Sequence, residues 1–333
     1  MRKLLVITIV LASLWGGYWF VGSSATERGL ASWIDARQQD GWMAEYTDLS
    51  THGFPNRFDT TITGLELADP NTGVAWSAPF FQILSLSYQP HHVIAVWPAT
   101  QTIATPEQKI DIESELMRGS IVFDPGTSIA LNRSSVEMTD IALSSSLGWQ
   151  SHLQSGQLAT RQTVGRPNTY DVNFQAHGLT PGAQFIQSLN AGDLLPGVFD
   201  GMSIDATLEF DAPWDRFAIE RARPQITSVE LKILKANWGD LDLWMAGTLN
   251  VDAQGVPSGE ITVKAKNWRE MVEVARAAGF LPDMLVPTVQ GALQFLAGLS
   301  GDPTTLDAPL TVKNGIVSLG PFPIGPAPNL TLH

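Results

Sequence analysis

Two groups of side chains in this sequence have types and spacings that could support chemistry. The adjacent residues His91 and His92 offer two imidazoles, which are common metal ligands. The carboxylates Asp111, Glu113 and Glu115 alternate along one predicted strand, so they share a face at intervals of about 7 Å. Paired carboxylates can perform acid–base work. These two groups are therefore the first candidates for a metal site and for a catalytic site.

Both groups also have a structural explanation, which the sequence favours. Neighbouring residues of an extended strand point to opposite faces, so His91 and His92 could not share one ion without a bulge. We interpret them as the polar start of a strand. Lys109 leads the row of carboxylates, and alternating charged rows of this kind are typical of a solvated sheet face. The same interpretation applies to Asp240 and Asp242.

Sequence motifs of common catalytic sites are missing. There is no G-x-S-x-G elbow, P-loop, H-E-x-x-H or G-x-G-x-x-G pattern. The absence of cysteine excludes disulfides, cysteine-based zinc sites and thiol catalysis. No serine, histidine or aspartate stands in a context that would activate a nucleophile. The remaining histidines suggest no site: His52, His152, His177 and His333. We therefore expect a protein that is not an enzyme, with no catalytic residues, no metal and no cofactor.

The bulk composition restricts the partners. The chain has 333 residues, of which 44% are hydrophobic and 16% are charged, which is enough apolar material for a large core. A formal net charge of −13 repels phosphate backbones, so nucleic acid is not an expected partner. The same charge disfavours direct electrostatic binding to anionic lipid headgroups.

The N-terminal segment predicts export from the cytoplasm. Arg2 and Lys3 precede an uncharged run from Leu4 to Thr26, which is long enough for a transmembrane helix. Trp15, Tyr18 and Trp19 cluster at its far end, where an aromatic belt would lie. The alternative is a signal peptide, cleaved after the small residues Ser23, Ser24 and Ala25.

We favour the uncleaved anchor. By the positive-inside rule its basic start stays in the cytoplasm and the body lies in the periplasm, in an inner-membrane protein with a single span. Cleavage would instead give a soluble periplasmic protein. After the anchor, the spacing of Leu30, Trp33, Ile34 and Arg37 predicts a short separate helix, capped at Ser24 or Thr26 and ended by Gly41.

From Phe54 onward the apolar period changes to two, which predicts many strands with one buried and one wetted face, typical of antiparallel sheet. The phase flips at Gly64, which suggests a bulge, and Asn314-Gly315 predicts a hairpin turn. The alternating segments are residues 58–67, 110–116, 121–124, 170–176, 206–211, 229–233, 240–245, 261–266 and 310–312.

Three further helices are predicted. The first begins at Thr180-Pro181 and ends at residues 190–192. The second begins with a capping box from Asn267 to Glu270 and ends at Gly279. The third begins at Pro287. The fold class is therefore β-rich α+β, a large and mostly antiparallel sheet with a few packed helices. Residues 1–26 form the anchor or signal, and residues 27–333 form the β-rich domain, with a possible lobe boundary near 161–168.

Several clusters resemble an uncharacterised bacterial envelope family known as domain of unknown function 2125. They are residues 53–58 (GFPNRF), 76–79 (WSAP), 88–98 (YQPHHVIAVWP), 314–320 (NGIVSLG) and 326–328 (PAP). The resemblance implies a secreted or membrane-anchored protein and assigns no site residues. The plan of one N-terminal anchor followed by long amphipathic sheet is also similar, at the level of the fold, to AsmA-like envelope proteins.

The functional hypothesis follows from the amphipathic strands. Trp244, one of 11 tryptophans, alternates with Asp240 and Asp242 and should face the polar side of its strand. An apolar sheet face that three short helices do not fully cover would accommodate acyl chains. We therefore expect a non-catalytic envelope protein that binds lipid or another apolar ligand or assists envelope assembly, with the membrane and a lipid or envelope protein as partners. The alternatives are a soluble periplasmic binding or scaffold module and, more distantly, a hydrolase.

Overall fold

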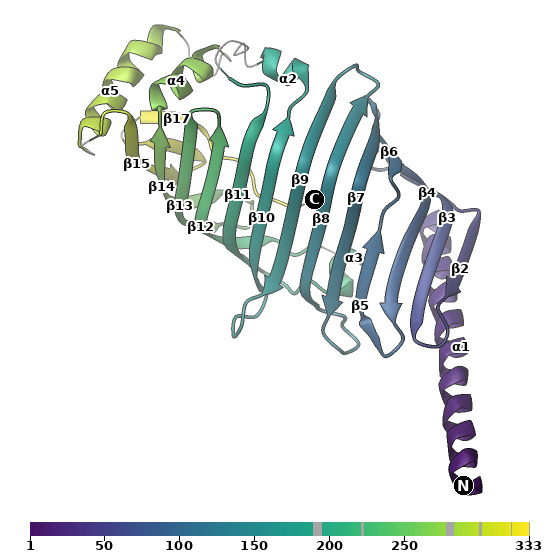
Figure 1. The fold of residues 1–333 in the computed structure, drawn as a ribbon. Coiled ribbons are helices and arrows are strands. Elements are labelled where there is room, and N and C mark those ends of the chain that lie inside the picture. The colour runs from purple at the N-terminus through teal and green to yellow at the C-terminus, as the bar shows by residue number, and fades with distance from the viewer. Residues whose placement is uncertain (189–194, 221–222, 278–282, 300–301, 321, 333) are drawn as a thin grey trace. The chain divides into compact units, whose positions relative to one another are not determined.

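The computed structural model describes residues 1–188, 195–220, 223–277, 283–299, 302–320 and 322–332 (Figure 1). The chain divides into two compact units. Unit 1 comprises residues 1–124 and 136–148, and unit 2 comprises residues 125–135 and 149–333. Strand β8 (Leu131–Ser145) contributes residues to both units.

Unit 1 contains one long helix and an antiparallel sheet. Strand β3 pairs with β1 and β2 along one edge and with β4 along the other. Strand β4 pairs with both β5 and β6, and these two strands both pair with β7. The elements are α1 (Arg2–Gln39), β1 (Met43–Glu45), β2 (Asp48–His52), β3 (Arg57–Asp69), β4 (Val74–Leu86), β5 (Gln89–Val96), β6 (Thr100–Ala104) and β7 (Lys109–Phe123).

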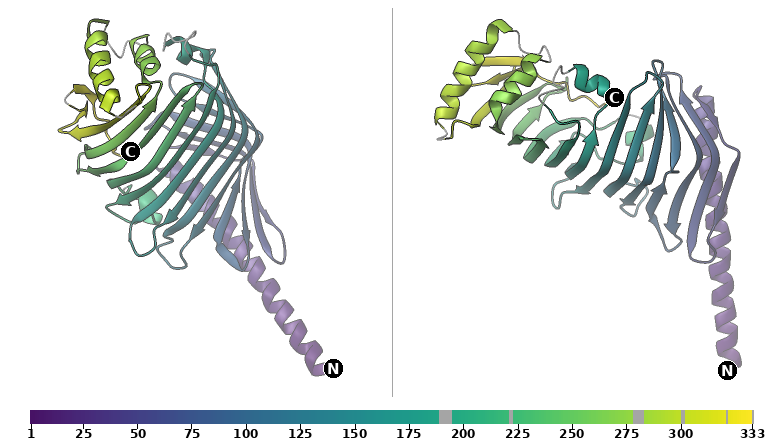
Figure 2. Two further views of the ribbon diagram at one scale, coloured as in Figure 1. Left: turned by 60° about the vertical axis from the view of Figure 1, so that its left-hand side comes forward. Right: turned by 45° about the horizontal axis from the view of Figure 1, so that its top comes forward.

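Unit 2 is an antiparallel meander from β9 to β17, in which each strand pairs with the next (Figure 2). Its strands are β9 (Gln150–Gln162), β10 (Thr169–Thr180), β11 (Phe199–Phe210), β12 (Ile226–Trp238), β13 (Leu241–Val251), β14 (Pro257–Lys266), β15 (Thr305–Lys313), β16 (Ile316–Leu319) and β17 (Phe322–Pro326). Its helices are α2 (Ala183–Ser188), α3 (Arg216–Glu220), α4 (Trp268–Ala277), the 3-10 turn η1 (Asp283–Leu285) and α5 (Val286–Leu299).

The predicted β-rich α+β class with antiparallel sheet is confirmed. The phase flip at Gly64 is also confirmed, because Ile62 and Leu65 are both buried. The predicted bulge is wrong, since the pairing of β3 with β4 keeps the same register on both sides of Gly64. The flip comes from the left-handed backbone of Gly64, whose φ is +61°. That conformation is accessible to glycine without steric cost.

The N-terminal helix is longer than predicted. Instead of an anchor followed by a separate short helix, α1 runs without a break through Ser24 and Thr26. The hydroxyl of Thr26 donates to the carbonyl oxygen of Gly22 one turn earlier, so it does not cap a new helix. The predicted end at Gly41 is confirmed, because Gly41 follows the last turn with a φ of +90°.

The helices of unit 2 match the prediction in part. α2 and α5 begin within two residues of their predicted starts, and α3 was not predicted. The predicted capping box at Asn267 is wrong. Asn267 has a left-handed φ of +57°, and its side-chain amide donates to the carbonyl oxygen of Asp240. The predicted ends of the first two helices, at residues 190–192 and at Gly279, lie outside the described residues.

The hairpin between β15 and β16 is confirmed. Lys313 pairs with Ile316 across the turn, and the φ values of Asn314 and Gly315 are +54° and +73°. Two positive values are the signature of a type I′ turn. The polar stretch 161–168, considered as a lobe boundary, lies within unit 2 at the turn from β9 to β10.

Helices α4 and α5 cover one part of the unit 2 sheet. They pack over β13 to β15 and form a buried cluster with apolar side chains of β14 and β15. The cluster consists of Ala265, Trp268, Val272, Val286, Leu293, Ala297, Leu306 and Ala308. The buried core of unit 2 therefore lies mainly at the C-terminal strands of the meander.

Candidate functional site

The principal candidate site is one face of the unit 2 sheet, which we call the apolar face. Residues directly opposite each other in antiparallel strands share a face, so the register defines its members. Phe174 of β10 lies opposite Ile204 of β11, which lies opposite Leu234 of β12, which lies opposite Met245 of β13. The rows on either side are equally apolar. They contain Val172, Ala176, Met202, Ala206, Leu208, Val229, Leu231, Ala236, Leu243 and Leu249.

The opposite face of the same strands is polar. Asp171 of β10 lies opposite Thr207 of β11, and Thr207 lies opposite Glu230 of β12. Trp244 lies between Lys235 and Lys264, so the prediction that this indole faces the polar side of its strand is confirmed. The unit 2 sheet is therefore strongly two-sided.

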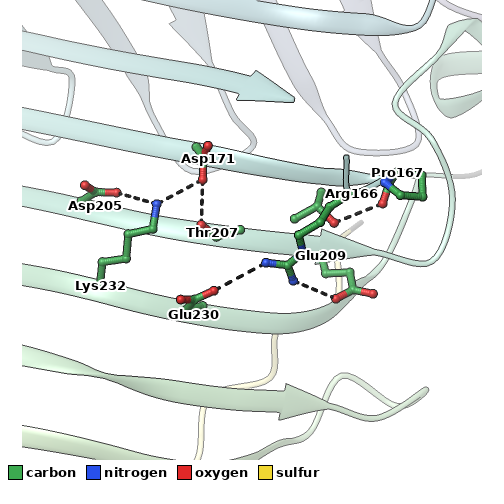
Figure 3. A network of polar contacts seen from close by, with 9 residues as sticks. Arg166, Pro167, Asp171, Asp205, Thr207, Glu209, Glu230 and Lys232 are labelled. Atoms are coloured by element: carbon green, nitrogen blue, oxygen red, sulfur yellow. Dashed lines mark hydrogen bonds and ion pairs between the residues drawn. The ribbon is translucent and has the colours of Figure 1, made fainter. Parts of the chain in front are cut away.

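Ion pairs cross the strands on the polar face (Figure 3). The ammonium group of Lys232 contacts Asp171 at 3.1 Å and Asp205 at 3.5 Å. The guanidinium group of Arg166 contacts Glu209 at 3.4 Å and Glu230 at 3.6 Å (Figure 3). These contacts connect β10, β11 and β12 on the side away from the apolar face.

The carboxyl group of Asp171 is stabilised in its charged form. Burial alone would raise its pKa, but hydrogen bonds from Thr207 and Lys232 outweigh burial and hold the pKa below its ordinary value. The Thr207 hydroxyl donates to this carboxylate at 2.8 Å. The hydrogen bond to Asp171 correspondingly raises the pKa of Lys232. These shifts belong to a structural ion pair, which is one known cause of a perturbed pKa.

Burial varies across the apolar face. Under α4 and α5, Val263 and Ala265 are buried. On β10 to β13, by contrast, most of the larger apolar side chains keep part of their surface in contact with solvent and are only half-buried. These are Val172, Phe174, Met202, Ile204, Leu208, Val229, Leu231, Leu234, Met245 and Leu249. A continuous apolar surface of this kind marks a binding site more often than scattered apolar residues do.

Aromatic side chains line one end of the apolar face. Tyr170 is buried and makes an edge contact with Phe210, which in turn makes an edge contact with Trp214. The Tyr170 hydroxyl donates to the carbonyl oxygen of Leu131. This end of the face is therefore a packed aromatic cluster.

Unit 1 has a pocket of about 520 Å³, but it is not an apolar cavity. Glu66, Thr100, Thr102, Asp111 and Glu113 are among its lining residues. This pocket is therefore not the apolar surface that we expect from the sequence to accommodate acyl chains. The larger apolar surface among the described residues is the apolar face of unit 2, not this pocket.

The carboxylate row of β7 lies at this pocket. Asp111 and Glu113 are exposed on one face, opposite Thr102 and Thr100 of β6. The Thr102 hydroxyl donates to Asp111 at 2.7 Å, and the Lys109 ammonium lies 3.3 Å from the same carboxylate. The hydrogen bond from Thr102, assisted by Lys109, lowers the pKa of Asp111. The row thus has the contacts of a solvated sheet face.

The histidine pair has no arrangement suited to a metal. His91 and His92 are consecutive residues of β5, and the His92 ring is hydrogen-bonded to the Ser120 hydroxyl at 2.9 Å. Within the part of the chain that the structure describes, no group of three or more histidine, aspartate or glutamate side chains could hold a metal ion.

A second feature is the packing of α1 on the sheet of unit 1, which sequence reasoning did not anticipate for the anchor residues from Trp15 to Ser23. Trp19 is buried against Phe54 and Phe58, and its indole donates to the carbonyl oxygen of Arg57 at 2.7 Å. Farther along the helix, Ile34 is buried as well. The last half of α1 is thus part of the folded domain, although the whole helix is also long and apolar enough to cross a membrane.

Comparison with known proteins identifies a family but no function. Residues 19–328 match the model of the family described as "Uncharacterized protein conserved in bacteria (DUF2125)". No curated protein and no solved structure matches the chain. The likeness to AsmA-like envelope proteins is therefore not supported by these comparisons.

Proposed function

Because the chain belongs to the DUF2125 family of uncharacterised bacterial proteins, we propose its function from its own geometry: a membrane-anchored, non-catalytic envelope protein that binds lipid acyl chains on the apolar face of unit 2. The observation that carries this proposal is the half-buried apolar surface that crosses β10, β11, β12 and β13 without a polar interruption.

The energy of such binding comes from completing the burial of these side chains. Each methylene group removed from water contributes about 0.8 kcal/mol, and apolar surface contributes about 25 cal/mol per Å². A chain laid across the rows of Phe174 and Leu231 would contact apolar atoms on every strand it crosses. The charged network around Lys232 lies on the opposite face, so binding requires no charge to be buried.

Retention of the anchor is supported by the packing of α1. A cut after Ala25 would remove Trp19 and Ser23, which are both buried, and would expose the Phe58 ring beneath them. It would also remove three hydrogen bonds to the backbone, because Trp15, Tyr18 and Trp19 donate to the carbonyl oxygens of Pro55, Ser87 and Arg57. We therefore favour the anchored protein over the soluble one.

The placement of the body in the periplasm rests on charge. Arg2 and Lys3 at the start of α1 remain on the cytoplasmic side by the positive-inside rule, which places the sheet on the other side. A protein partner that covers the apolar face is the second candidate, since an amphipathic helix would bury the same side chains. A hydrolase has no support from any site among the described residues.

The test places a photoreactive amino acid on either face of the same strands. The full-length chain is expressed in bacteria with the label at Phe174 or Leu231 on the apolar face. The matched controls carry it at Gln175 or Glu230, which are the next or preceding residues and are exposed on the polar face. Lipid adducts are then identified by mass spectrometry after irradiation of intact cells.

We expect lipid adducts from Phe174 and Leu231 and not from their controls. Adducts to a single protein at the same two positions would replace the lipid proposal with the protein partner. Equal labelling on both faces, or none at either, would refute a binding role for the apolar face.

A further inference from the structure

The uncharged part of α1 is long enough to span a bilayer only if it includes residues that contact the domain. The run from Leu4 to Thr26 has 23 residues and no charge, which at 1.5 Å per residue corresponds to about 34 Å and matches a hydrocarbon core of about 30 Å. The part before the first contact with the sheet, Leu4 to Leu14, is only about 16 Å long by the same rise. The span must therefore extend into the contact zone that begins at Trp15. A span that ends at Phe20 has 17 residues, at the short end of the range for transmembrane helices of about 17–25 residues. It places the contacts of Trp15, Tyr18 and Trp19 near its outer end.

In this contact zone, the side-chain donors of Trp15, Tyr18 and Trp19 each have a backbone partner. The Trp15 indole donates to the carbonyl oxygen of Pro55 at 3.0 Å, and the Tyr18 hydroxyl donates to that of Ser87 at 2.5 Å. The Trp19 indole donates to the carbonyl oxygen of Arg57. Buried or membrane-embedded polar groups require such partners, because unsatisfied ones are costly where water is scarce.

The two loops that supply the carbonyl groups of Pro55 and Ser87 each carry one exposed aromatic side chain. We call residues 53–56 and 87–90 the membrane rim. Phe54 is 57% exposed and Tyr88 is 58% exposed, although both are large hydrophobic side chains. Phe54 stacks on Phe20 of α1, with ring centroids 5.8 Å apart, so the loop continues the apolar surface of the helix. On α1 itself, Phe20 and Val21 are likewise exposed.

The membrane rim carries no formal charge, so lowering it into the headgroup layer desolvates no ion. The nearest charged side chain is Arg57, whose guanidinium group is exposed and paired with Asp59. A cation at this depth suits lipid phosphates, which Arg contacts through a planar fork of donors. Tyrosine and tryptophan are the residues enriched at this level of membranes.

We propose that the membrane rim lies in the headgroup layer of the same bilayer that α1 spans, with Phe54 and Tyr88 inserted beside the helix. This inference rests on the proposed anchor. Insertion of the membrane rim would hold unit 1 at the membrane surface, so that unit 1 would not be connected to the membrane by α1 alone. The strands β3 and β4 then lead away from the bilayer. Their connecting turn at Asn71 lies about 40 Å farther out, from the 13 residues of β4 and a strand rise of about 3.3 Å.

The test uses the absence of native cysteine, which allows one label per molecule. In the full-length chain, Asn56→Cys and Gln89→Cys place an environment-sensitive fluorophore on exposed positions of the membrane rim without removing Phe54 or Tyr88. Asn71→Cys reports the far turn, and Leu11→Cys reports the free part of α1. Each variant is reconstituted into phosphatidylcholine–phosphatidylglycerol vesicles containing lipids with nitroxides at shallow or deep positions.

We expect the labels at Asn56 and Gln89 to emit at shorter wavelength than the label at Asn71 and to be quenched most by the shallow nitroxide. The label at Leu11 should be quenched most by the deep one. If Leu11 is quenched and both membrane-rim labels behave like Asn71, the membrane rim is in water and this inference is overturned while the anchor stands. If Leu11 itself is unquenched, the anchor proposal fails.

Discussion

The contact between α1 and the sheet can be tested at two glycines of the same helix. Gly22 faces Phe58 so closely that a Cβ atom at this position would lie 2.5 Å from the Cζ atom of the ring and 3.1 Å from Cε1. A Cβ atom at Gly29 would meet nothing within 4 Å. Gly22→Ala and Gly29→Ala are therefore the same substitution in one helix. The new methyl group meets the Phe58 ring at position 22 and meets no neighbour at position 29.

Helix propensity and packing act in opposite directions at Gly22. Alanine in place of a helical glycine contributes about 1 kcal/mol of stability, which both variants gain. At Gly22 the new methyl group must displace the Phe58 ring, which is buried and lies against Tyr18 and Trp19 with centroid distances of 6.4 and 6.2 Å. Overpacking of this kind costs about 1–3 kcal/mol. We expect Gly22→Ala to be neutral or destabilising and Gly29→Ala to be stabilising.

The assay is thermal unfolding of the full-length variants in detergent micelles, followed by tryptophan fluorescence. A difference of 1–3 kcal/mol between the two variants should separate their midpoints by several degrees, at about 2–4 °C per kcal/mol for domains of this size. If both variants are stabilised equally, the Phe58 ring does not contact Gly22. The argument that α1 forms part of the folded domain would then be wrong.

Three further outcomes follow from the same structure. Gly315→Val should lower the free energy of unfolding by roughly 1–3 kcal/mol, because a φ of +73° is strained for a branched residue. Gly325→Val is the control and should have little effect, since a Cβ atom at Gly325 would meet nothing within 4 Å and its φ is not positive. Asp171→Asn should lower the free energy of unfolding at neutral pH by roughly 0.5–1 kcal/mol. The native chain loses this contribution only below about pH 4, as the carboxylate becomes protonated. If denaturant titrations give the same stability difference between native chain and variant at pH 3 as at neutral pH, this expectation is wrong. Intact mass of the membrane-extracted protein should include residues 1–25, and a mature chain that starts near Thr26 would contradict the anchor.

The sign of the Asp171 effect follows from the direction of its shift. The folded pKa lies below the ordinary value of 3.8, so the interaction stabilises the fold at every pH above the unfolded value. That contribution is lost as the pH falls through the folded value. Asp205→Asn is the matched control. Asp205 contacts the same Lys232 at the longer distance of 3.5 Å, and its loss should have the smaller effect.

Strand periodicity predicted which residues share a face on β10 and β13. It was wrong on β12, where a register shift places Ile233 opposite Asp205 on the polar face, although Ile233 stands two residues after Leu231. The alternation of Tyr170, Val172, Phe174 and Ala176 placed them together, and the register with β11 agrees. Trp244 was likewise placed on the polar side, because its neighbours at spacing two are aspartates. These inferences succeed because the side-chain period of a strand is fixed by its backbone and does not depend on tertiary contacts.

Local signals failed where tertiary contacts decide the structure. Ser24 and Thr26 have the side chains of helix caps, yet α1 continues through them because Trp19 on one side and Ile34 on the other both pack on the sheet. Asn267 has the sequence of a capping box, but its amide is used to bond the turn at Asp240. In both cases a weak local preference was outweighed by contacts with residues distant in sequence.

Tertiary contacts also explain why the sequence alone did not locate the candidate site on particular strands. Leu231 and Val263 have the same type of strand pattern, and the sequence around them does not say which will be covered. The structure places α4 and α5 over β14 and β15, where Val263 is buried, and leaves Leu231 half-buried. Strands β12 and β14 are about equally apolar on this face, so the difference in burial between Leu231 and Val263 comes from the placement of α4 and α5. An apolar sheet face that helices cover does not reduce the solubility of the protein. An apolar face left uncovered promotes aggregation unless a ligand or partner binds to it. The uncovered part of the apolar face is therefore where the proposed ligand would complete the burial that α4 and α5 provide over β14 and β15.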